Sequence, residues 1–322
     1  MLIPTHARPE AIARCVGALA TQETGGARVE VLVGIDGPDQ GERDALAPMA
    51  RALDLRVLEG ERRGPAATRN RLLAAARSPL TLLLNDDVVP RPGLLLGHLG
   101  AHRALERPAL VLGDAPFARR DGESLFDRLI RESSMVFFYD QMNADDPARD
   151  WGFRHAWTLN LSLPTSIVRE VGGFCESLPG AAYEDIELAW RLRQRYGAPV
   201  LYRPGARVVH EHAYTPAAYL AREEALGRDA GALARANPAC ALELFGRDVC
   251  SEDEIAYARE YVERECATAQ RLRRTFDGLA DMPGSSASAF MVRVLYEHHL
   301  ALKRWHWRVG RVEGAQAASP PA

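Results

Sequence analysis

Leu80-Thr81-Leu82-Leu83-Leu84-Asn85-Asp86-Asp87 is the stretch that decides the fold. Its first five residues, four of them Leu, predict a strand buried on both faces, as in a parallel sheet. The strand stops at two adjacent carboxylates, and in an open α/β sheet ligands bind beyond the carboxyl ends of the strands. Carboxylate oxygens suit Mg²⁺ or Mn²⁺, which commonly bridge to substrate phosphates. The alternative is a polar turn that only closes the strand.

Strands and helices alternate along the first part of the chain. Residues 2–5, 29–35 and 55–58 have the apolar character of strands, and residues 7–22 and 42–53 have the periodicity of helices. Such alternation predicts a parallel sheet with right-handed crossovers. The polar residues that end these strands would then lie along one edge of the sheet: Thr5, Asp36, Asn85, Asp86 and Asp87.

A glycine loop opens the helix that precedes the central strand. Gly64-Pro65-Ala66-Ala67-Thr68-Arg69-Asn70 would offer backbone N–H groups and a positive dipole end to a phosphate. The loop has neither the Walker lysine pattern nor Gly-x-Gly-x-x-Gly, which argues against a P-loop NTPase and a dinucleotide site. Arg69 is either a phosphate clamp or an ordinary surface residue. Asp36 is either an acceptor for a base or ribose, or a turn residue.

A helix at residues 184–193 carries an acid on its inward stripe. Asp185 shares one face with Leu188, Ala189 and Leu192, so it points toward the interior or a cleft. The alternative role for Asp185 is to complement the helix dipole. Two histidines end the second of two short predicted strands, 200–202 and 207–209. His210 and His212 lie on one side of an extended chain, and His210 is the better candidate for a metal ligand.

Composition limits the protein's partners and location. The chain has 322 residues and a net charge of −3, so it lacks the basic footprint of a nucleic-acid-binding protein. Its five cysteines are odd in number and widely spaced, which predicts reduced thiols and a cytoplasmic location. We see no signal peptide and no apolar run of about 18 residues that would cross a membrane.

Further helices are predicted in the rest of the chain. We expect one at residues 124–139 and, beyond Pro216, three more at 217–235, 251–274 and 289–308. The last of these ends in Lys303-Arg304-Trp305-His306-Trp307-Arg308. A basic aromatic end of this kind suits peripheral contact with the inner face of a membrane and a lipid-linked acceptor. The alternative is packing on its own domain or on a second subunit of a homodimer. Residues 314–322 are predicted to be disordered.

Taken together, six motifs resemble a family 2 glycosyltransferase with the GT-A fold, over about residues 2–212. The resemblance implies an α/β protein with a GT-A, Rossmann-like, mostly parallel central sheet flanked by helices, and a helical C-terminal extension. We expect a glycosyltransferase domain at 1–215, with a nucleotide-binding half at 1–113 and an acceptor-binding half at 114–215. The extension would cover 216–313. The motifs are Ile3-Pro4-Thr5-His6-Ala7-Arg8-Pro9, Gly34-Ile35-Asp36-Gly37, the Gly64–Asn70 loop, Leu84-Asn85-Asp86-Asp87, Asn160-Leu161-Ser162 before Gly172-Gly173-Phe174, and Glu184-Asp185-Ile186-Glu187-Leu188 with His210.

The resemblance also implies roles for single residues. The family inverts the anomeric centre of nucleotide-sugar donors, here with a UDP-sugar favoured, and Asp185 would be the catalytic base. Asp87 and His210 would hold Mn²⁺ or Mg²⁺ at the family's Asp-x-Asp position, where Asn85 replaces the first acid. The donor would contact Thr5, Asp36, Gly64, Arg69, Asn85 and Asp86, and the acceptor Trp157, Asn160 and Glu184.

Two other functions stay open on the sequence. A catalytically silent sugar-nucleotide-binding scaffold would fit the neutral Asn85, although Asp87, Asp185 and His210 argue against it. A sugar-phosphate nucleotidyltransferase should have a Gly-rich, basic loop just after the first strand, and residues 4–9 do not form one. The acceptor stays undefined: a saccharide, a lipid-linked sugar or a small molecule.

Overall fold

The computed structural model describes residues 1–178 and 180–318. By their internal contacts these residues form two compact units. The first unit contains Met1–Phe117, Gln141–Glu176 and Glu184–His212, and the second contains Ala118–Asp140, Ser177–Tyr183 and Ala213–Ala322. Segments 118–140 and 177–183, which we expected in a 1–215 domain, therefore group with the C-terminal helices.

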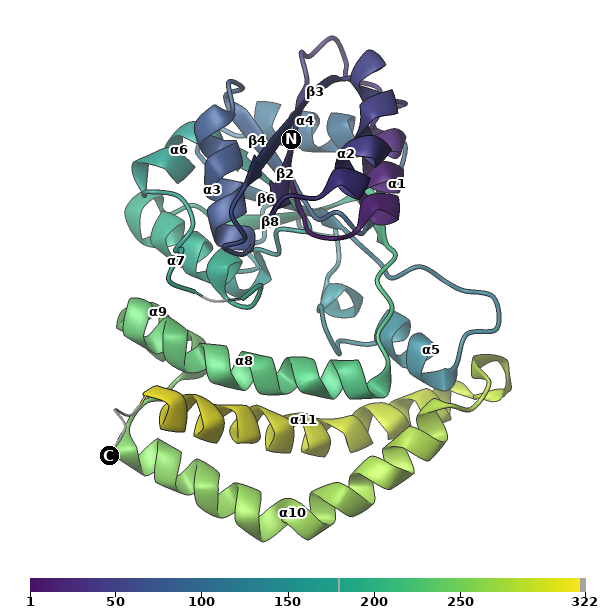
Figure 1. The fold of residues 1–322 in the computed structure, drawn as a ribbon, viewed down its shortest axis with the longest axis vertical. Helices are drawn as coiled ribbons and strands as arrows, with labels where there is room; N and C mark the ends of the chain where they lie inside the picture. Colours follow the sequence, from purple (N-terminus) through teal and green to yellow (C-terminus); the bar gives the residue numbers. More distant parts are fainter. Residues whose placement is uncertain (179, 319–322) are drawn as a thin grey trace. The chain divides into compact units, whose positions relative to one another are not determined.

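An eight-stranded sheet forms the centre of the first unit (Figure 1). The order of its strands is β3-β2-β1-β4-β7-β6-β8-β5, and the first four are parallel, as predicted. β7 lies antiparallel between β4 and β6, β8 is parallel to β6, and β5 is antiparallel to β8. The strands are β1 Leu2–Thr5, β2 Glu30–Asp36, β3 Asp54–Gly60, β4 Leu80–Leu84, β5 Val88–Pro90, β6 Leu110–Asp114, β7 Asn160–Pro164 and β8 Val200–His210.

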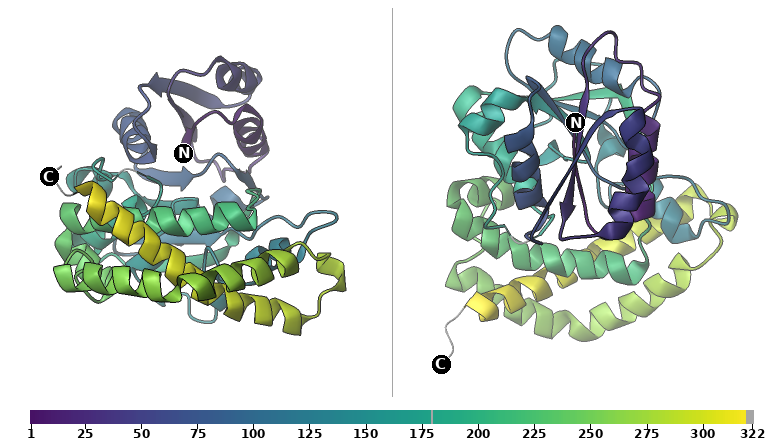
Figure 2. Two further views of the ribbon diagram at one scale, coloured as in Figure 1. Left: turned by 60° about the horizontal axis from the view of Figure 1, so that its bottom comes forward. Right: turned by 45° about the horizontal axis from the view of Figure 1, so that its top comes forward.

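Helices cover this sheet, which confirms the predicted α/β class. α1 and α2 lie on one side of the β1–β4 strands and α3 lies on the other (Figures 1 and 2). α1 buries Ile12, Val16 and Leu19 on the sheet side of the helix, whereas Ala20, just past its end, is exposed. Every residue of β2 is buried, as expected for a strand covered on both faces. The helices of this unit are α1 Pro9–Leu19, α2 Gln40–Leu46, α3 Pro65–Ala75, α4 Leu94–Arg103, α6 Thr165–Glu170 and α7 Glu184–Tyr196, with short 3₁₀ turns at Ala47–Arg51 and Phe153–His155.

The second unit is helical. Long helices α8, α10 and α11 run side by side in it (Figures 1 and 2). The basic aromatic residues 303–308, which were predicted to end the last helix, lie inside α11 and pack within this unit: the Trp305 indole N–H donates to the Val262 carbonyl, and His306 Nδ1 lies 2.7 Å from Glu224 Oε1. None of the described helices is long and apolar enough to span a bilayer. The helices are α5 Leu125–Glu132, α8 Pro216–Ala236, α9 Pro238–Phe245, α10 Glu252–Ala280 and α11 Ala289–Ala318, with 3₁₀ turns at Tyr139–Gln141, where the two units meet in the sequence, and at Gly284–Ser286.

The structure corrects several predicted boundaries. Residues 200–202 and 207–209 belong to one strand, β8, whose register against β6 shifts between Gly113 and Asp114. The helix expected at 124–139 ends at Glu132, and α9 was not predicted. α11 continues through residues 314–318, so the prediction of disorder there is wrong, whereas 319–322 lie outside the described residues.

Candidate active site

Asp86 and Asp87 follow β4 and meet groups from the end of β1. The Thr5 hydroxyl lies 3.0 Å from Asp86 Oδ2, as expected for neighbouring parallel strands that end at one edge. Arg8 Nη1 lies 3.1 Å from Asp86 Oδ1 and 3.0 Å from Asp87 Oδ2. Burial and the adjacent charge of Asp87 raise the pKa of Asp86 to about 6, although Arg8 and Thr5 oppose the shift.

Both predicted histidines reach Asp87. β5 starts directly after Asp87 and pairs with the end of β8, with Val88 opposite His210. His210 Nε2 therefore lies 3.4 Å from Asp87 Oδ1, and His212 Nδ1 lies 3.3 Å from Oδ2. Burial by itself would raise the pKa of Asp87, but contacts with the two histidines and Arg8 hold that pKa far below its usual range.

Arg69 connects the acidic pair's strand to helix α7. Its side chain is buried, and Nη1 donates to Glu184 Oε1 at 2.7 Å while Nη2 donates to Asn85 Oδ1 at 3.3 Å. The guanidinium also lies over the Phe174 ring, 5.5 Å from its centroid. Arg69, Asn85 and Glu184 thus contact one another, and the donor-binding role of Arg69 and Asn85 and the acceptor-binding role of Glu184 stay predictions.

Asp185 stands beside this buried pair at the start of α7. It is half-buried, and Oδ1 accepts the backbone N–H of Ile186 at 2.8 Å. Burial first, and then the charge of Glu184, raise the pKa of Asp185 to about 7, with Arg69 opposing them. Among the described residues, no cation forms a salt bridge with Asp185 within the limits of a direct ion pair. A carboxyl group with a pKa near neutrality suits a general base.

Asp36 and Gly64 are joined by a hydrogen bond. The Asp36 carboxylate accepts the backbone N–H groups of Arg63 and Gly64, each at 2.9 Å, and the Thr68 hydroxyl at 3.1 Å. Gly64 has φ +87°, a conformation that glycine adopts without strain. The Gly64 N–H is thus directed at Asp36, and Asp36 fixes the loop before α3. Contact of this loop and of Asp36 with the donor stays a prediction.

Two of the predicted acceptor contacts are core residues. Asn160 is fully buried: its amide donates to the carbonyls of Asp114 and Ala206, and its oxygen lies 2.9 Å from His98 Nε2. Trp157 is buried with its ring 5.3 Å from His155. Their burial gives both residues a structural role, and contact with the acceptor stays a prediction for each. No signal in the sequence separates a buried Asn at a strand start from one that faces a ligand.

The donor set around Asp87 fits a divalent ion that brings further ligands with it. No group of three or more His, Cys, Asp and Glu side chains among the described residues is arranged to hold a metal by itself. Asp87 and His210 supply one carboxylate and one imidazole, and Mg²⁺ or Mn²⁺ commonly completes such a set with water and substrate phosphate oxygens. The residues present thus fit a metal that binds together with a diphosphate.

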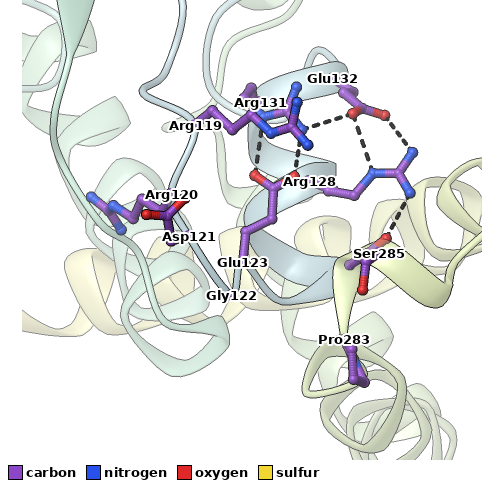
Figure 3. Close-up of a pocket in the computed structure, with 11 residues that line it drawn as sticks. Arg119, Arg120, Asp121, Gly122, Glu123, Arg128, Arg131, Glu132, Pro283 and Ser285 are labelled. Carbon is purple, nitrogen blue, oxygen red and sulfur yellow. Dashed lines mark hydrogen bonds and ion pairs between the residues drawn. The ribbon is translucent and has the colours of Figure 1, made fainter.

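A cavity of about 620 Å³ lies in the second unit, and none of the predicted site residues lines it (Figure 3). Arg128 donates to Glu132 and to the carbonyls of Gly284 and Ala287. Arg131 donates to Glu123 and lies 2.9 Å from Glu132. Figure 3 shows both arginines directed at the carboxylates of Glu123 and Glu132, which line the same cavity. Because neighbouring carboxylates neutralise Arg128 and Arg131, these two side chains do not mark a second site for an anion.

Comparison with other sequences finds similarity to known proteins in the N-terminal part of the chain. Residues 1–159 match the model of glycosyl transferase family 2. Validoxylamine A glucosyltransferase of Streptomyces hygroscopicus subsp. limoneus is 30% identical over 220 residues, which cover 62% of this chain and 48% of that protein. Pre-mycofactocin glycosyltransferase of Mycobacterium tuberculosis is 33% identical over 184 residues, which cover 55% and 36%. The chain thus spans about half, or less, of the length of these relatives.

Solved structures share the fold across nearly the whole chain. S. aureus TarS 1-349 matches with a TM-score of 0.55 and 14% identity, over 98% of this chain and 90% of that one. The mannosyltransferase PcManGT from Pyrobaculum calidifontis, solved with GDP-Man and Mn²⁺, matches with a TM-score of 0.59 and 14% identity, over 98% and 86%. At this identity the likeness concerns the fold alone.

Proposed function

Because residues 1–159 of this chain match the model of glycosyl transferase family 2, we propose that the protein moves a sugar from a nucleotide-diphosphate sugar to an acceptor hydroxyl. The transfer inverts the anomeric centre, and a divalent metal assists it. The curated relatives named as glucosyltransferase and glycosyltransferase support the reaction class. TarS structures with UDP and UDP-GlcNAc support a UDP-sugar as donor, whereas PcManGT, solved with GDP-Man, makes guanosine the second choice.

One observation carries the proposal: Arg69 joins the strand of the acidic pair to the helix of Asp185. Through Asn85 it fixes the residue before Asp86, and through Glu184 it fixes the residue before Asp185. The two carboxylates, more than ninety positions apart in the sequence, belong to one unit, and Arg69 contacts the residue before each of them. A base and a leaving-group site that approach the donor from different elements suit a single displacement at the anomeric carbon.

Asp185 is the general base. As the acceptor oxygen bonds to the anomeric carbon and the bond to the diphosphate oxygen breaks, Asp185 takes the acceptor's hydroxyl proton. Its pKa of about 7 leaves a large share of the carboxylate ionised at neutral pH and strong enough to accept that proton. Asp87 and His210 would hold Mn²⁺ or Mg²⁺, which supplies positive charge for the departing diphosphate. Thr5 and Asp86 fix the floor of the donor site through their mutual hydrogen bond.

The neutral Asn85 is consistent with an active enzyme. Its amide oxygen accepts a hydrogen bond from the buried Arg69, so the residue serves the link to α7. The feature that favoured a silent scaffold thus has a structural reason of its own. The acceptor, a homodimer and a peripheral place at the inner face of the membrane stay predictions.

The test is release of UDP from UDP-sugars, with and without Mn²⁺, by the wild type and by Asp185→Asn. We expect the substitution to lower transfer by about 10²- to 10⁴-fold, the usual contribution of a positioned base, and to leave UDP binding unchanged. Asp44→Asn, an exposed residue of α2, is the matched control and should behave as wild type. Transfer by Asp185→Asn at the wild-type rate would refute the assignment, and pyrophosphate exchange would indicate a nucleotidyltransferase.

A further inference from the structure

Arg8 occupies the space between the two acids of the candidate metal site. A single nitrogen, Nη1, is 3.1 Å from Asp86 Oδ1 and 3.0 Å from Asp87 Oδ2, so one cation bridges both carboxylates. A divalent ion bound to Asp87 would lie next to this guanidinium. Two positive groups a few ångströms apart repel each other, and they do so more strongly at a partly buried site than in bulk water. The ion and the arginine therefore compete for the pair.

The backbone conformation before Arg8 orients this side chain toward the two acids. Ala7 has φ +52°, and it is the one non-glycine residue of the described chain with positive φ. A left-handed alanine is strained and persists where the surroundings enforce it, often at functional sites. The enforcing group is Glu42, which is fully buried and accepts the Arg8 backbone N–H at 3.0 Å and the Thr5 hydroxyl at 2.5 Å.

The Arg8 side chain, in contrast, is partly exposed to solvent. The Arg8 side chain is 45% exposed, whereas that of Asp86 is 9% exposed and that of Asp87 is 12% exposed. The backbone of Arg8 is thus fixed by a buried carboxylate while its guanidinium reaches the acids from the solvent side. Because the backbone of Arg8 is fixed, its guanidinium would stay near the acids after it separates from them. A guanidinium is the side-chain group best suited to bind a phosphate through two parallel hydrogen bonds.

We propose that Arg8 is the resident counter-ion of the Asp86–Asp87 pair, that a divalent cation displaces it, and that the released guanidinium then binds the donor diphosphate. The identity of the diphosphate rests on the proposed function, but the competition between Arg8 and the cation does not. The cation binds weakly alone, because it must displace Arg8, and tightly with the nucleotide, which gives Arg8 a new partner. Cation and nucleotide therefore each strengthen the binding of the other by the same factor.

The experiment measures Mn²⁺ binding by electron paramagnetic resonance of the free ion, first without nucleotide and then with UDP. Arg8→Gln should bind Mn²⁺ alone on the order of tenfold more tightly than wild type, the middle of the usual range for coupled ligands. The gain in Mn²⁺ affinity on adding UDP should be smaller in Arg8→Gln than in wild type. Arg14→Gln, which removes the same charge from the exposed ion pair between Arg14 of α1 and Glu211, should bind Mn²⁺ as wild type does.

Equal or weaker binding of Mn²⁺ alone by Arg8→Gln would overturn the proposal, and so would an equal gain in Arg14→Gln. Arg8→Lys keeps the charge without the planar fork and should fall between wild type and Arg8→Gln; it decides the question if Arg8→Gln fails to fold by circular dichroism. A wild type that binds no nucleotide and hydrolyses no donor would refute the proposed function, while the comparison in Mn²⁺ alone would still decide the role of Arg8.

Discussion

Adjacent carboxyl groups in this site have opposite electrostatic surroundings. Asp87 contacts Arg8 and two histidines, and its pKa is held far below its usual range in spite of burial. Burial and the charge of Asp87 raise the pKa of Asp86 instead, to about 6. Asp87 is thus ionised at neutral pH, as a metal ligand must be. Asp86 instead contacts Thr5 and Arg8.

The pH dependence of transfer is a prediction about a single residue. Because the pKa of Asp185 is raised to about 7, protonation below that pH removes the base, and kcat/KM should fall as the pH decreases through this value. Glu184→Gln removes the charge that is the second cause of the raised pKa, after burial. The acid limb of the profile should therefore move to lower pH in this variant, as measured with saturating Mn²⁺ and a fixed UDP-sugar.

The same variant loses the ion pair with Arg69, so its folding must be checked by its melting temperature. Glu187→Gln is a useful control, because Glu187 lies on the same helix and forms its own buried pair with Arg191. An acid limb that stays in place in folded Glu184→Gln would contradict the assignment of Asp185 as the titrating base.

At the scale of elements, pairing between strands brings the site together. β5 is only three residues long, but its antiparallel pairing with β8 sets Val88 opposite His210 and so carries both histidines to Asp87. In the second unit, two long helices pack closely against each other at glycine residues. Gly227 of α8 faces the carbonyl of Trp307, and Gly310 of α11 faces the carbonyl of Glu224. Glycine is needed at both positions because any side chain would collide with the backbone of the other helix.

Gly310→Ala tests this helix pair. The added methyl group would meet the backbone of Glu224, which cannot give way as a side chain can, so we expect a loss of about 1–3 kcal/mol in the free energy of unfolding. Gly278→Ala on α10 is the matched control, because a methyl group there meets nothing within 4 Å. That variant should gain about 0.5–1 kcal/mol from helix propensity. Urea denaturation measures both, and equal stability of the two variants would contradict close packing.

On the scale of the whole molecule, the candidate site lies within one of the two units. Every residue to which we assign a role in donor binding or catalysis belongs to the first unit. A nucleotide and a metal therefore stabilise that unit directly, because ligands that bind only the native state lower its free energy.

Thermal unfolding with UDP and Mn²⁺ checks this assignment. At a hundred times the dissociation constant the ligands add about 2.7 kcal/mol, which corresponds to about 4 °C for a chain of 322 residues that unfolds in one transition. If two transitions are resolved by calorimetry, the one that belongs to the first unit should shift. Asp87→Asn should lose most of the shift. The same rise in Asp87→Asn as in wild type would place the ligands elsewhere.

Local patterns were enough to predict the fold class and the edge of the sheet where the site lies. Hydrophobic periodicity depends on neighbours in the sequence, and parallel strands must end at one edge, so these two rules place Thr5, Asp86 and Asp87 together from the sequence alone. The order of the motifs likewise indicated the family, and the match over residues 1–159 agrees with it.

Only the tertiary structure decided which way each polar side chain faces. Asp36 turns to the loop before α3, Asn160 to the core, Arg69 to Asn85 and Glu184, and Arg8 to the acidic pair. Each partner is supplied by strand register or helix packing, often across dozens of residues. A carboxylate at the end of a strand has the same local sequence whether it binds a loop, a metal or water. Its partner depends on which backbone the rest of the fold brings beside it.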